Sequence, residues 1–125
     1  MSEAAPTILI VEDEPGIRKL IRIALAPCGF HILEAQNGVE AETLLRSYAG
    51  PIRLAVLDIV MPGGNGLDLA VHLQIERPDT ALLYISGFSE SIAVASIARK
   101  NPASVLVKPF TVEQLLTRVQ KLLAA

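Results

Sequence analysis

The sequence is poor in aromatic residues, in cysteine and in long hydrophobic runs. It has no Trp among 125 residues, and aromatic residues make up only 4%. The core must therefore be aliphatic, and the 51% hydrophobic content is enough to build one. The single cysteine, Cys28, excludes an internal disulfide and is interpreted as a packing residue at a helix end. No apolar run is long enough to span a membrane, so we expect no membrane insertion.

Clusters of basic residues are also missing. The chain has 11 basic and 13 acidic residues, with a formal net charge of −2. Without a cluster of basic residues to follow a phosphate backbone, we expect no direct binding of nucleic acid. The first residues lack the features of a signal peptide, which predicts a cytoplasmic protein. The length fits one domain, predicted over residues 7–125, and residues 1–6 are expected to be a flexible N-terminus.

Strand-like and helix-like segments alternate along the whole chain. Short apolar runs predict strands at 7–11, 31–34, 54–57, 81–85 and 105–107. Helical spacing of apolar residues predicts five helices, and the fourth covers 91–100. The apolar positions are Ile17, Leu20, Ile21, Ala24 and Leu25 in the first helix and Ala41, Leu44, Leu45 and Tyr48 in the second. They are Leu67, Ala70, Val71 and Ile75 in the third helix and Val112, Leu115, Leu116, Val119 and Leu122 in the fifth. Five strand-then-helix units predict an α/β, (βα)5 fold, a doubly wound five-stranded parallel sheet with helices on both faces.

Polar residues follow four of the predicted strands. In an open parallel sheet, ligands bind beyond the carboxyl ends of the strands. The residues at those ends are carboxylates, a hydroxyl and an ammonium group: Glu12, Asp13 and Glu14 after the first strand, Asp58 after the third, Ser86 after the fourth and Lys108 after the fifth. We therefore expect the functional site at this edge of the sheet.

The acidic residues at this edge predict a metal site. Two unit charges about 4 Å apart repel by roughly 4 kcal/mol at an effective dielectric constant near 20. A cluster of carboxylates therefore needs a cation or a raised pKa. Carboxylate oxygens suit Mg²⁺. Zinc does not fit, because no His or Cys has ligand spacing with these acids, and His31 and His72 are interpreted as surface or helix-face residues.

Asp58 lies where a buried strand meets a glycine-rich loop, MPGGNG at 61–66. A carboxylate held there can attack phosphorus and form an acyl phosphate. Such a transfer needs charge neutralisation and donors to the phosphoryl oxygens, which Asp13 with its metal, Lys108, the Ser86 hydroxyl and the Gly87 amide can supply. Taken singly, these residues have simpler roles: acids at a helix start, a loop lysine, a turn serine. Their occurrence together favours phosphoryl chemistry.

Four stretches in order resemble the response-regulator receiver domains of two-component signalling. They are ILIVEDEP at 8–15, LAVLDIVMPGGNGLDL at 54–69, YISGF at 84–88 and LVKPF at 106–110. The resemblance spans nearly the whole chain and implies the flavodoxin-like strand order 2-1-3-4-5. It also implies a phospho-acceptor signalling domain, not an enzyme, which assists only its own phosphorylation and autodephosphorylation.

The resemblance assigns roles to individual residues. Asp58 would be the phospho-acceptor. The Mg²⁺ ligands would be Asp13, Asp58, Glu12 through a water molecule and the backbone carbonyl of Val60. Ser86, Lys108 and the Gly87 backbone would contact the phosphoryl group, and the Lys108–Pro109 peptide would be cis.

Partners follow from the same resemblance. The phosphoryl donor would be the phospho-histidine of a histidine kinase or histidine phosphotransfer protein. Phosphorylation would then change the surface formed by the helix at 91–100, the strand at 105–107 and the last helix, for a downstream protein or self-association. The apolar residues Ile92, Val94 and Ile97 predict an interaction face on that helix.

The sequence departs from the family pattern at three places. Glu12 stands where Asp is more usual, and Val105 stands where a Tyr or Phe often reports activation. Val60 and Phe88 occupy positions that tune dephosphorylation. Neither side chain can orient a water molecule, which predicts a long-lived aspartyl phosphate.

Three other classes of protein compete with this interpretation. A pseudo-receiver would be a phosphorylation-independent protein-interaction module, but it need not keep Asp13, Asp58, Ser86 and Lys108 together. A metal-dependent phosphatase or nuclease would carry a second acid two residues after Asp58, where Val60 stands. A flavin or nucleotide binder would need a phosphate loop after the first strand. The sequence contains no output domain, so it acts through protein contacts or belongs to a longer protein such as a hybrid kinase.

Overall fold

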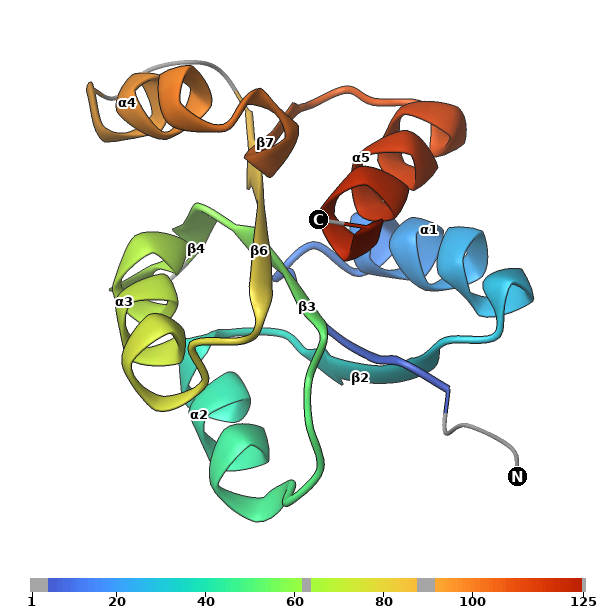
Figure 1. Cartoon of the computed structure of the whole chain (residues 1–125), viewed down its shortest axis with the longest axis vertical. Coiled ribbons are helices and arrows are strands. Elements are labelled where there is room, and N and C mark those ends of the chain that lie inside the picture. Colours follow the sequence, from blue (N-terminus) through green and yellow to red (C-terminus); the bar gives the residue numbers. More distant parts are fainter. Residues whose placement is uncertain (1–4, 62–63, 88–91, 125) are drawn as a thin grey trace.

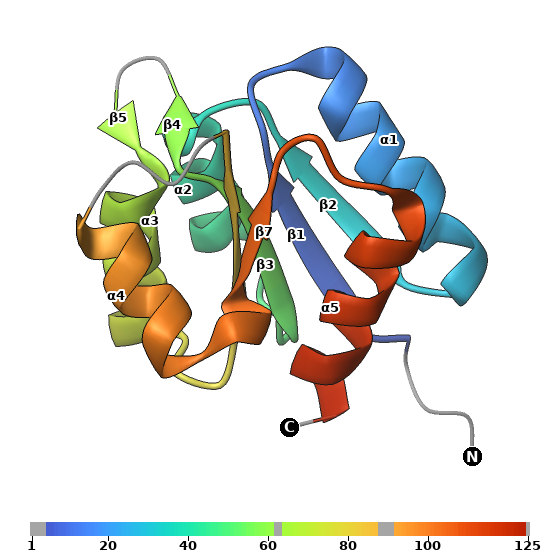
Figure 2. The same cartoon turned by 90° about the horizontal axis from the view of Figure 1, so that it is seen from above.

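The computed structural model describes residues 5–61, 64–87 and 92–124. Most of the expected N-terminal lead-in, residues 1–6, lies outside this part of the chain. The main sheet has five parallel strands, in the spatial order β2-β1-β3-β6-β7 (Figures 1 and 2). The strands are β1 (Thr7–Val11), β2 (His31–Ala35), β3 (Leu54–Asp58), β6 (Ala81–Ser86) and β7 (Val105–Val107). This is the predicted order 2-1-3-4-5, with β6 and β7 as the fourth and fifth strands.

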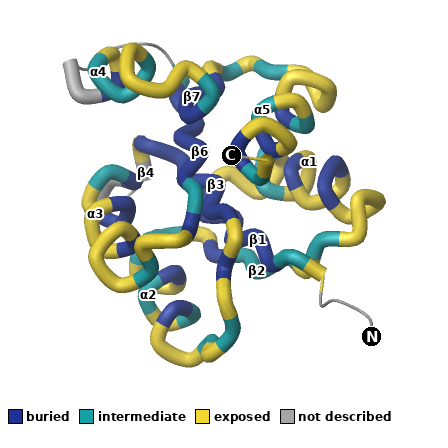
Figure 3. Tube along the Cα trace, in the orientation of Figure 1, coloured by how far each residue is buried: buried dark blue, intermediate teal, exposed yellow. Residues whose placement is uncertain are grey.

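In the described part of the chain, five α-helices cover the two faces of the sheet. They are α1 (Pro15–Leu25), α2 (Gly38–Ser47), α3 (Gly66–Glu76), α4 (Ile92–Lys100) and α5 (Val112–Ala124). Figure 2 shows α1 and α5 on one face and α2, α3 and α4 on the other. All residues of β1 and β3 are buried, as expected for strands covered on both sides (Figure 3). The two fully buried strands therefore lead directly to the acidic residues: Glu12 and Asp13 follow β1, and Asp58 ends β3.

Alternate strand residues feed two hydrophobic clusters. Leu9, Val11 and Leu57 face α2, α3 and α4. Ile8, Ile10 and Val56 face α1 and α5. The side-chain alternation of a strand produces this division. Among the buried hydrophobic residues that the structure describes, only Tyr84 is aromatic.

Helix ends follow local sequence signals. The Thr111 hydroxyl accepts from the Gln114 N–H at 3.0 Å and the Gln114 side chain accepts from the Thr111 N–H at 2.9 Å, which is a capping box at the start of α5. Asn37 caps α2 by accepting from the Glu40 N–H at 2.8 Å. After α1, a 3₁₀ turn (Ala26–Cys28) leads to Gly29, whose φ of 84° a non-glycine residue rarely adopts. Cys28 lies at this helix end, as predicted, but it is exposed, so the packing role predicted for it is wrong.

The buried face of α3 differs from the prediction. Val71 and Ile75 are 53% and 72% exposed. Leu69 and Leu73, together with Ala70, make the buried face instead. The prediction failed because apolar residues occur almost all round this helix, so their spacing does not define a single stripe. Two further residues assigned to apolar helix faces, Leu20 of α1 and Val112 of α5, are 36% and 39% exposed.

The fourth helix packs on the sheet. Val94 is buried and Ile97 contacts the core cluster, so these two residues do not form the interaction face predicted for them. Ser91 and the Ile92 side chain lie outside the described part of the structure. The sequence also did not predict a short antiparallel pair, β4 (Val60–Met61) with β5 (Gly64–Asn65), or the 3₁₀ turn Pro102–Ser104. None of the described helices combines the length and hydrophobicity needed to cross a bilayer.

Candidate functional site

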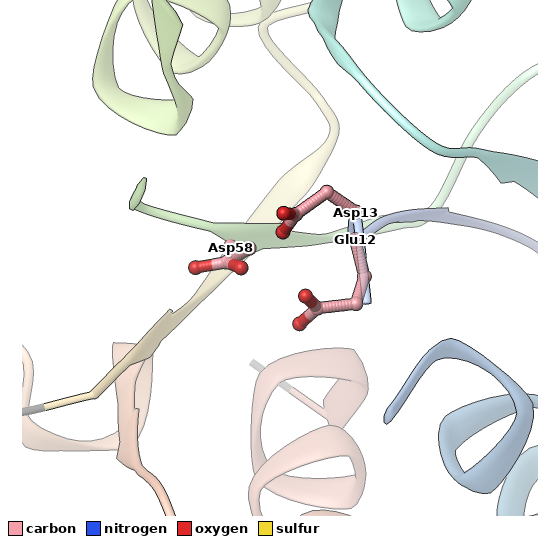
Figure 4. Close-up of side chains that lie close together, drawn as sticks. All are labelled: Glu12, Asp13 and Asp58. Atoms are coloured by element: carbon pink, nitrogen blue, oxygen red, sulfur yellow. The ribbon is translucent and has the colours of Figure 1, made fainter. Parts of the chain in front are cut away.

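Three carboxylates meet at the carboxyl edge of the sheet. Glu12 and Asp13 directly follow β1, and Asp58 is the last residue of β3. Because β1 and β3 are parallel neighbours, their ends lie together. One carboxylate oxygen from each residue lies within 4.8 Å of the others, and Figure 4 shows the side chains converging. The sequence predicted this acidic cluster.

Lys108 and Ser86 complete this edge. Lys108 follows β7, and its Nζ lies 3.4 Å from Glu12 Oε1 and 3.4 Å from Asp58 Oδ2. Ser86 is the buried last residue of β6, and its carbonyl accepts from the Lys108 N–H at 2.7 Å. The Lys108–Pro109 peptide is cis, as predicted. The structure thus brings one cation between two of the carboxylates.

Glu12 is the most buried member of the cluster, with 1% of its surface exposed. Its Oε2 accepts from the Glu14 N–H at 3.2 Å. Its Oε1 has no hydrogen-bond partner among the described residues. Burial, assisted by the neighbouring Asp58, raises the pKa of Glu12 to about 8, although the Glu14 N–H and Lys108 act in the opposite direction. Without a metal ion, Glu12 therefore holds a proton near neutral pH.

Asp58 and Lys108 are also held by specific contacts. Asp58 is 4% exposed; its Oδ1 accepts from the Val60 N–H at 3.1 Å and its Oδ2 faces Lys108. Burial lowers the pKa of Lys108, but the attraction of Glu12 and Asp58 outweighs burial and leaves that pKa raised. Lys108 is therefore charged at neutral pH.

Of the other residues named from the sequence, Gly87 and Val60 lie at this edge, and the two histidines lie away from it. Gly87 follows Ser86 at the same edge, and Val60 directs its N–H to Asp58 while its side chain is 75% exposed. The roles of the Gly87 amide and the Val60 carbonyl remain predictions, and Phe88 lies outside the described residues. His31 contacts Thr7 and Tyr48, and His72 contacts Glu42, away from the cluster.

Two residues near the site were missed from the sequence. Arg18 Nη1 donates to the Glu12 carbonyl at 2.8 Å, and Gly66 lies directly against the Asp58 backbone. A glycine at a helix start is a weak signal for close backbone approach. No local pattern identifies Arg18, because its partner is a main-chain atom.

The cluster suits a hard divalent cation. Its donors are all carboxylate oxygens, which Mg²⁺ prefers and zinc sites rarely use alone. The buried Glu12 Oε1 is a second indication: the Lys108 ammonium lies 3.4 Å away, but among the described residues no donor makes a hydrogen bond to this oxygen, and a buried acceptor without one is unfavourable. A cation would relieve both the repulsion among the acids and this missing interaction. The residues present therefore fit Mg²⁺.

The family model of the response regulator receiver domain matches residues 8–120. The chain belongs to this family. This receiver is 32% identical over 118 residues to the response regulator receiver protein CpdR of Brucella abortus, covering 94% of the chain and 97% of CpdR. It is 33% identical over 117 residues to the sensor kinase CckA of the same organism, but it spans only 12% of CckA's length.

Solved receiver structures share the fold. The response regulator TrrA of Thermotoga maritima, in complex with Mg²⁺-BeF, is 33% identical, with a TM-score of 0.73 and coverage of 94% of this chain and 98% of TrrA. Another response regulator from Thermotoga maritima is 27% identical with a TM-score of 0.81, covering 97% of this chain and 99% of that one. The receiver is thus a signalling domain of two-component systems, from a family that binds Mg²⁺ at an acidic pocket and receives phosphoryl groups from histidine kinases or phosphotransfer proteins.

Proposed function

We propose that this receiver, formed by residues 7–125, accepts a phosphoryl group on Asp58 in a Mg²⁺-dependent reaction. The donor is the phospho-histidine of a histidine kinase or histidine phosphotransfer protein. The observation that carries this proposal is the position of Asp58: a buried carboxylate at the end of a central strand, beside two further acids and Lys108. TrrA, a relative with the same fold, has been solved with Mg²⁺-BeF.

The reaction forms a bond between an Asp58 carboxylate oxygen and phosphorus while the bond between phosphorus and the donor imidazole nitrogen breaks. The imidazole leaves with that electron pair. The protein contributes mainly position and charge. The Val60 N–H and Lys108 hold the Asp58 carboxylate in one orientation. Lys108 also places a positive charge where phosphoryl oxygens arrive.

Asp13, Asp58, Glu12 through a water molecule and the Val60 carbonyl would hold Mg²⁺. When bound, the ion supplies positive charge that offsets both the carboxylate repulsion and the charge of the phosphoryl group. A cation at this cluster would lower the raised pKa of Glu12 again, because positive charge favours the ionised carboxylate, and Glu12 would then act as a carboxylate acceptor for the bound water. The repulsion among the carboxylates is thus unfavourable without a cation and would be relieved by one.

Phosphorylation would be read out at the surface of α4, β7 and α5. Ser86, Lys108 and the Gly87 amide contact the phosphoryl group in this proposal, and the direct bond between the Ser86 carbonyl and the Lys108 N–H links the ends of β6 and β7. A change at either residue therefore reaches both loops. Val107 and Val112 are 48% and 39% exposed on this surface, available to a downstream protein or a second copy.

The phosphoryl group on Asp58 would be long-lived. Val60, two residues away, presents an apolar, largely exposed side chain that cannot orient a water molecule for attack on phosphorus. Autodephosphorylation is consequently slow. A hydrolysis time course as fast as that of a Val60→Gln variant would contradict this part of the proposal.

The test is intact-mass spectrometry after incubation with acetyl phosphate, with MgCl₂ or with EDTA. We expect one phosphoryl adduct on the wild-type protein, only with magnesium, and none on Asp58→Asn. Asp79→Asn is the matched control, because Asp79 is an exposed acid outside the site. If the folded wild-type protein gains no adduct, a phosphorylation-independent interaction module becomes the better interpretation.

A further inference from the structure

We propose that Arg18 is a positioning residue for the metal site: it fixes the Glu12 carbonyl so that the Glu12–Asp13 segment presents its carboxylates to the cation. This inference rests on the Mg²⁺ binding in the proposed function. It concerns a residue of α1 that touches the main chain of the site and none of its carboxylates.

Arg18 connects the acidic segment to the neighbouring strand. Its Nη1 donates to the Glu12 carbonyl at 2.8 Å, and its Nε lies 3.6 Å from Glu34 Oε1. Glu34 belongs to β2, which pairs with β1. The Arg18 side chain is 21% exposed, so most of its surface is covered by neighbouring atoms.

Both main-chain polar groups of Glu12 are therefore held. Its N–H donates to the Ala35 carbonyl at 3.1 Å, which continues the β1–β2 ladder by one residue. Its carbonyl lies beyond the ladder and is held by Arg18 instead. The peptide that carries this carbonyl leads directly to the Asp13 Cα. Any rotation of that peptide moves the Asp13 side chain relative to Asp58.

Magnesium is sensitive to such a movement. It requires nearly ideal octahedral geometry at short distances, so small displacements of a ligand weaken binding. Residues that orient metal ligands typically change affinity by about 10- to 100-fold when they are removed. Arg18 orients the metal ligands through its contact with the Glu12 carbonyl, so loss of this contact, and not loss of the charge, should lower the affinity for Mg²⁺.

The chain provides a matched control for the charge. Arg22 lies one turn later on α1, and its Nη1 is 3.3 Å from Oε2 of the same Glu34. Among the described residues, it has no hydrogen bond or ion pair with the acidic cluster. Arg18→Met and Arg22→Met thus remove the same charge and the same ion-pair partner, and only Arg18→Met removes the bond to Glu12.

Positioning and simple electrostatics predict opposite signs. Removing a positive charge near an acidic site strengthens cation binding, because less repulsion opposes the ion. Removing the bond to the Glu12 carbonyl weakens cation binding, because the ligands lose their fixed geometry. The sign of the change in Mg²⁺ affinity of Arg18→Met therefore separates the two roles.

The experiment is a MgCl₂ titration of the full chain, followed by amide NMR signals near Asp13. We expect the Kd for Mg²⁺ to rise by roughly tenfold in Arg18→Met and to stay equal to wild type, or fall slightly, in Arg22→Met. Arg18→Lys keeps the charge but lacks the planar fork that reaches Glu12 and Glu34 together, so it should not restore affinity. In metal-free protein, the amide signals of Asp13 and Glu14 should shift in Arg18→Met only.

An unchanged or lower Kd in Arg18→Met, or an equal rise in Arg22→Met, would overturn the inference. If Arg18→Met does not fold, Arg18→Lys takes its place, because it keeps the positive charge and lacks the planar fork; a Kd equal to wild type there overturns the inference too. The titration needs no phosphorylation. A wild-type protein that binds Mg²⁺ but gains no adduct therefore contradicts the proposed function and leaves the Arg18 result interpretable.

Discussion

The contact between Gly66 and Asp58 leads to a quantitative prediction. Gly66 is the buried first residue of α3, and its N–H donates to the Ile59 carbonyl at 2.8 Å. A Cβ atom built on Gly66 would lie 2.2 Å from the Asp58 carbonyl oxygen and 3.0 Å from its carbonyl carbon. The atoms in the way belong to the main chain, so no side-chain rotation can relieve the clash. Gly66→Ala must therefore move the helix start or the Asp58 backbone.

The size of the effect follows from this distance. Real Cβ atoms essentially never approach closer than 3.0 Å, so the contact must open by at least 0.8 Å, the difference from 2.2 Å. Overpacking of this kind costs about 1–3 kcal/mol. Alanine also restricts the unfolded chain relative to glycine, which offsets about 0.4–1 kcal/mol. The difference between these two terms is a net loss in the free energy of unfolding of roughly 1 kcal/mol.

The displacement should also slow phosphorylation. A misplacement of about 1 Å at a reacting group costs on the order of 100-fold in rate, and the Asp58 main chain is one of the two partners that must move. The assay pairs urea denaturation followed by far-UV circular dichroism with the rate of adduct formation from acetyl phosphate. Gly16→Ala in α1 is the control, because a Cβ there meets nothing within 4 Å.

The control should behave in the opposite way. Gly16→Ala should raise the free energy of unfolding by about 0.5–1 kcal/mol, since helix propensity and the restricted unfolded chain both favour alanine. Its phosphorylation rate should match that of wild type. If Gly66→Ala is as stable as wild type, or gains as much stability as Gly16→Ala, the close approach of α3 to Asp58 does not exist as described.

Four further predictions concern the charges and contacts of the site and its supports. The pKa of Glu12 is about 8 in the folded protein against an ordinary 4.5, so between these pH values the metal-free folded state binds a proton that the unfolded state does not. The free energy of unfolding should therefore fall as pH rises from about 4.5 to 8. In Glu12→Gln this fall should be absent, as measured by urea denaturation at several pH values. Lys108→Met removes the cation between two carboxylates, so MgCl₂ titration should give tighter binding while the adduct forms more slowly. Arg77→Met loses three bonds to the carbonyls at the end of α2 and should destabilise by about 2–3 kcal/mol with an unchanged Kd for Mg²⁺. Val60→Gln offers an amide that can orient water, and the phosphorylated protein should lose its adduct several-fold faster by mass spectrometry.

The sequence contained most of what places the site. Buried parallel strands appear as uninterrupted apolar runs, so the ends of β1 and β3, and with them Asp13 and Asp58, could be located without a structure. The rule that ligands bind beyond the carboxyl ends of the strands then selected Ser86 and Lys108 as well. Here the local pattern and the sheet topology point to the same residues.

The sequence could not reveal contacts whose partners are main-chain atoms or neighbours in space. Arg18 lies within α1 and Arg77 directly after α3, and nothing in the sequence distinguishes either residue; only the folded chain brings their guanidinium groups to carbonyl oxygens. The exposure of Val71 and Ile75 had a different cause. When a helix is apolar on nearly every side, packing against neighbouring elements determines which residues are buried, and the spacing of apolar residues does not identify the buried face.

Glu12 explains how this site is kept ready for a cation. Its side chain reaches Lys108 with one oxygen and returns to the Glu14 N–H with the other. Fully buried strands hold it in place, so the protein cannot relieve the repulsion from Asp58 by moving apart. Only a proton or a cation can do so, and the two compete for the same cluster. Magnesium affinity should therefore rise with pH until Glu12 has lost its proton, above about pH 8.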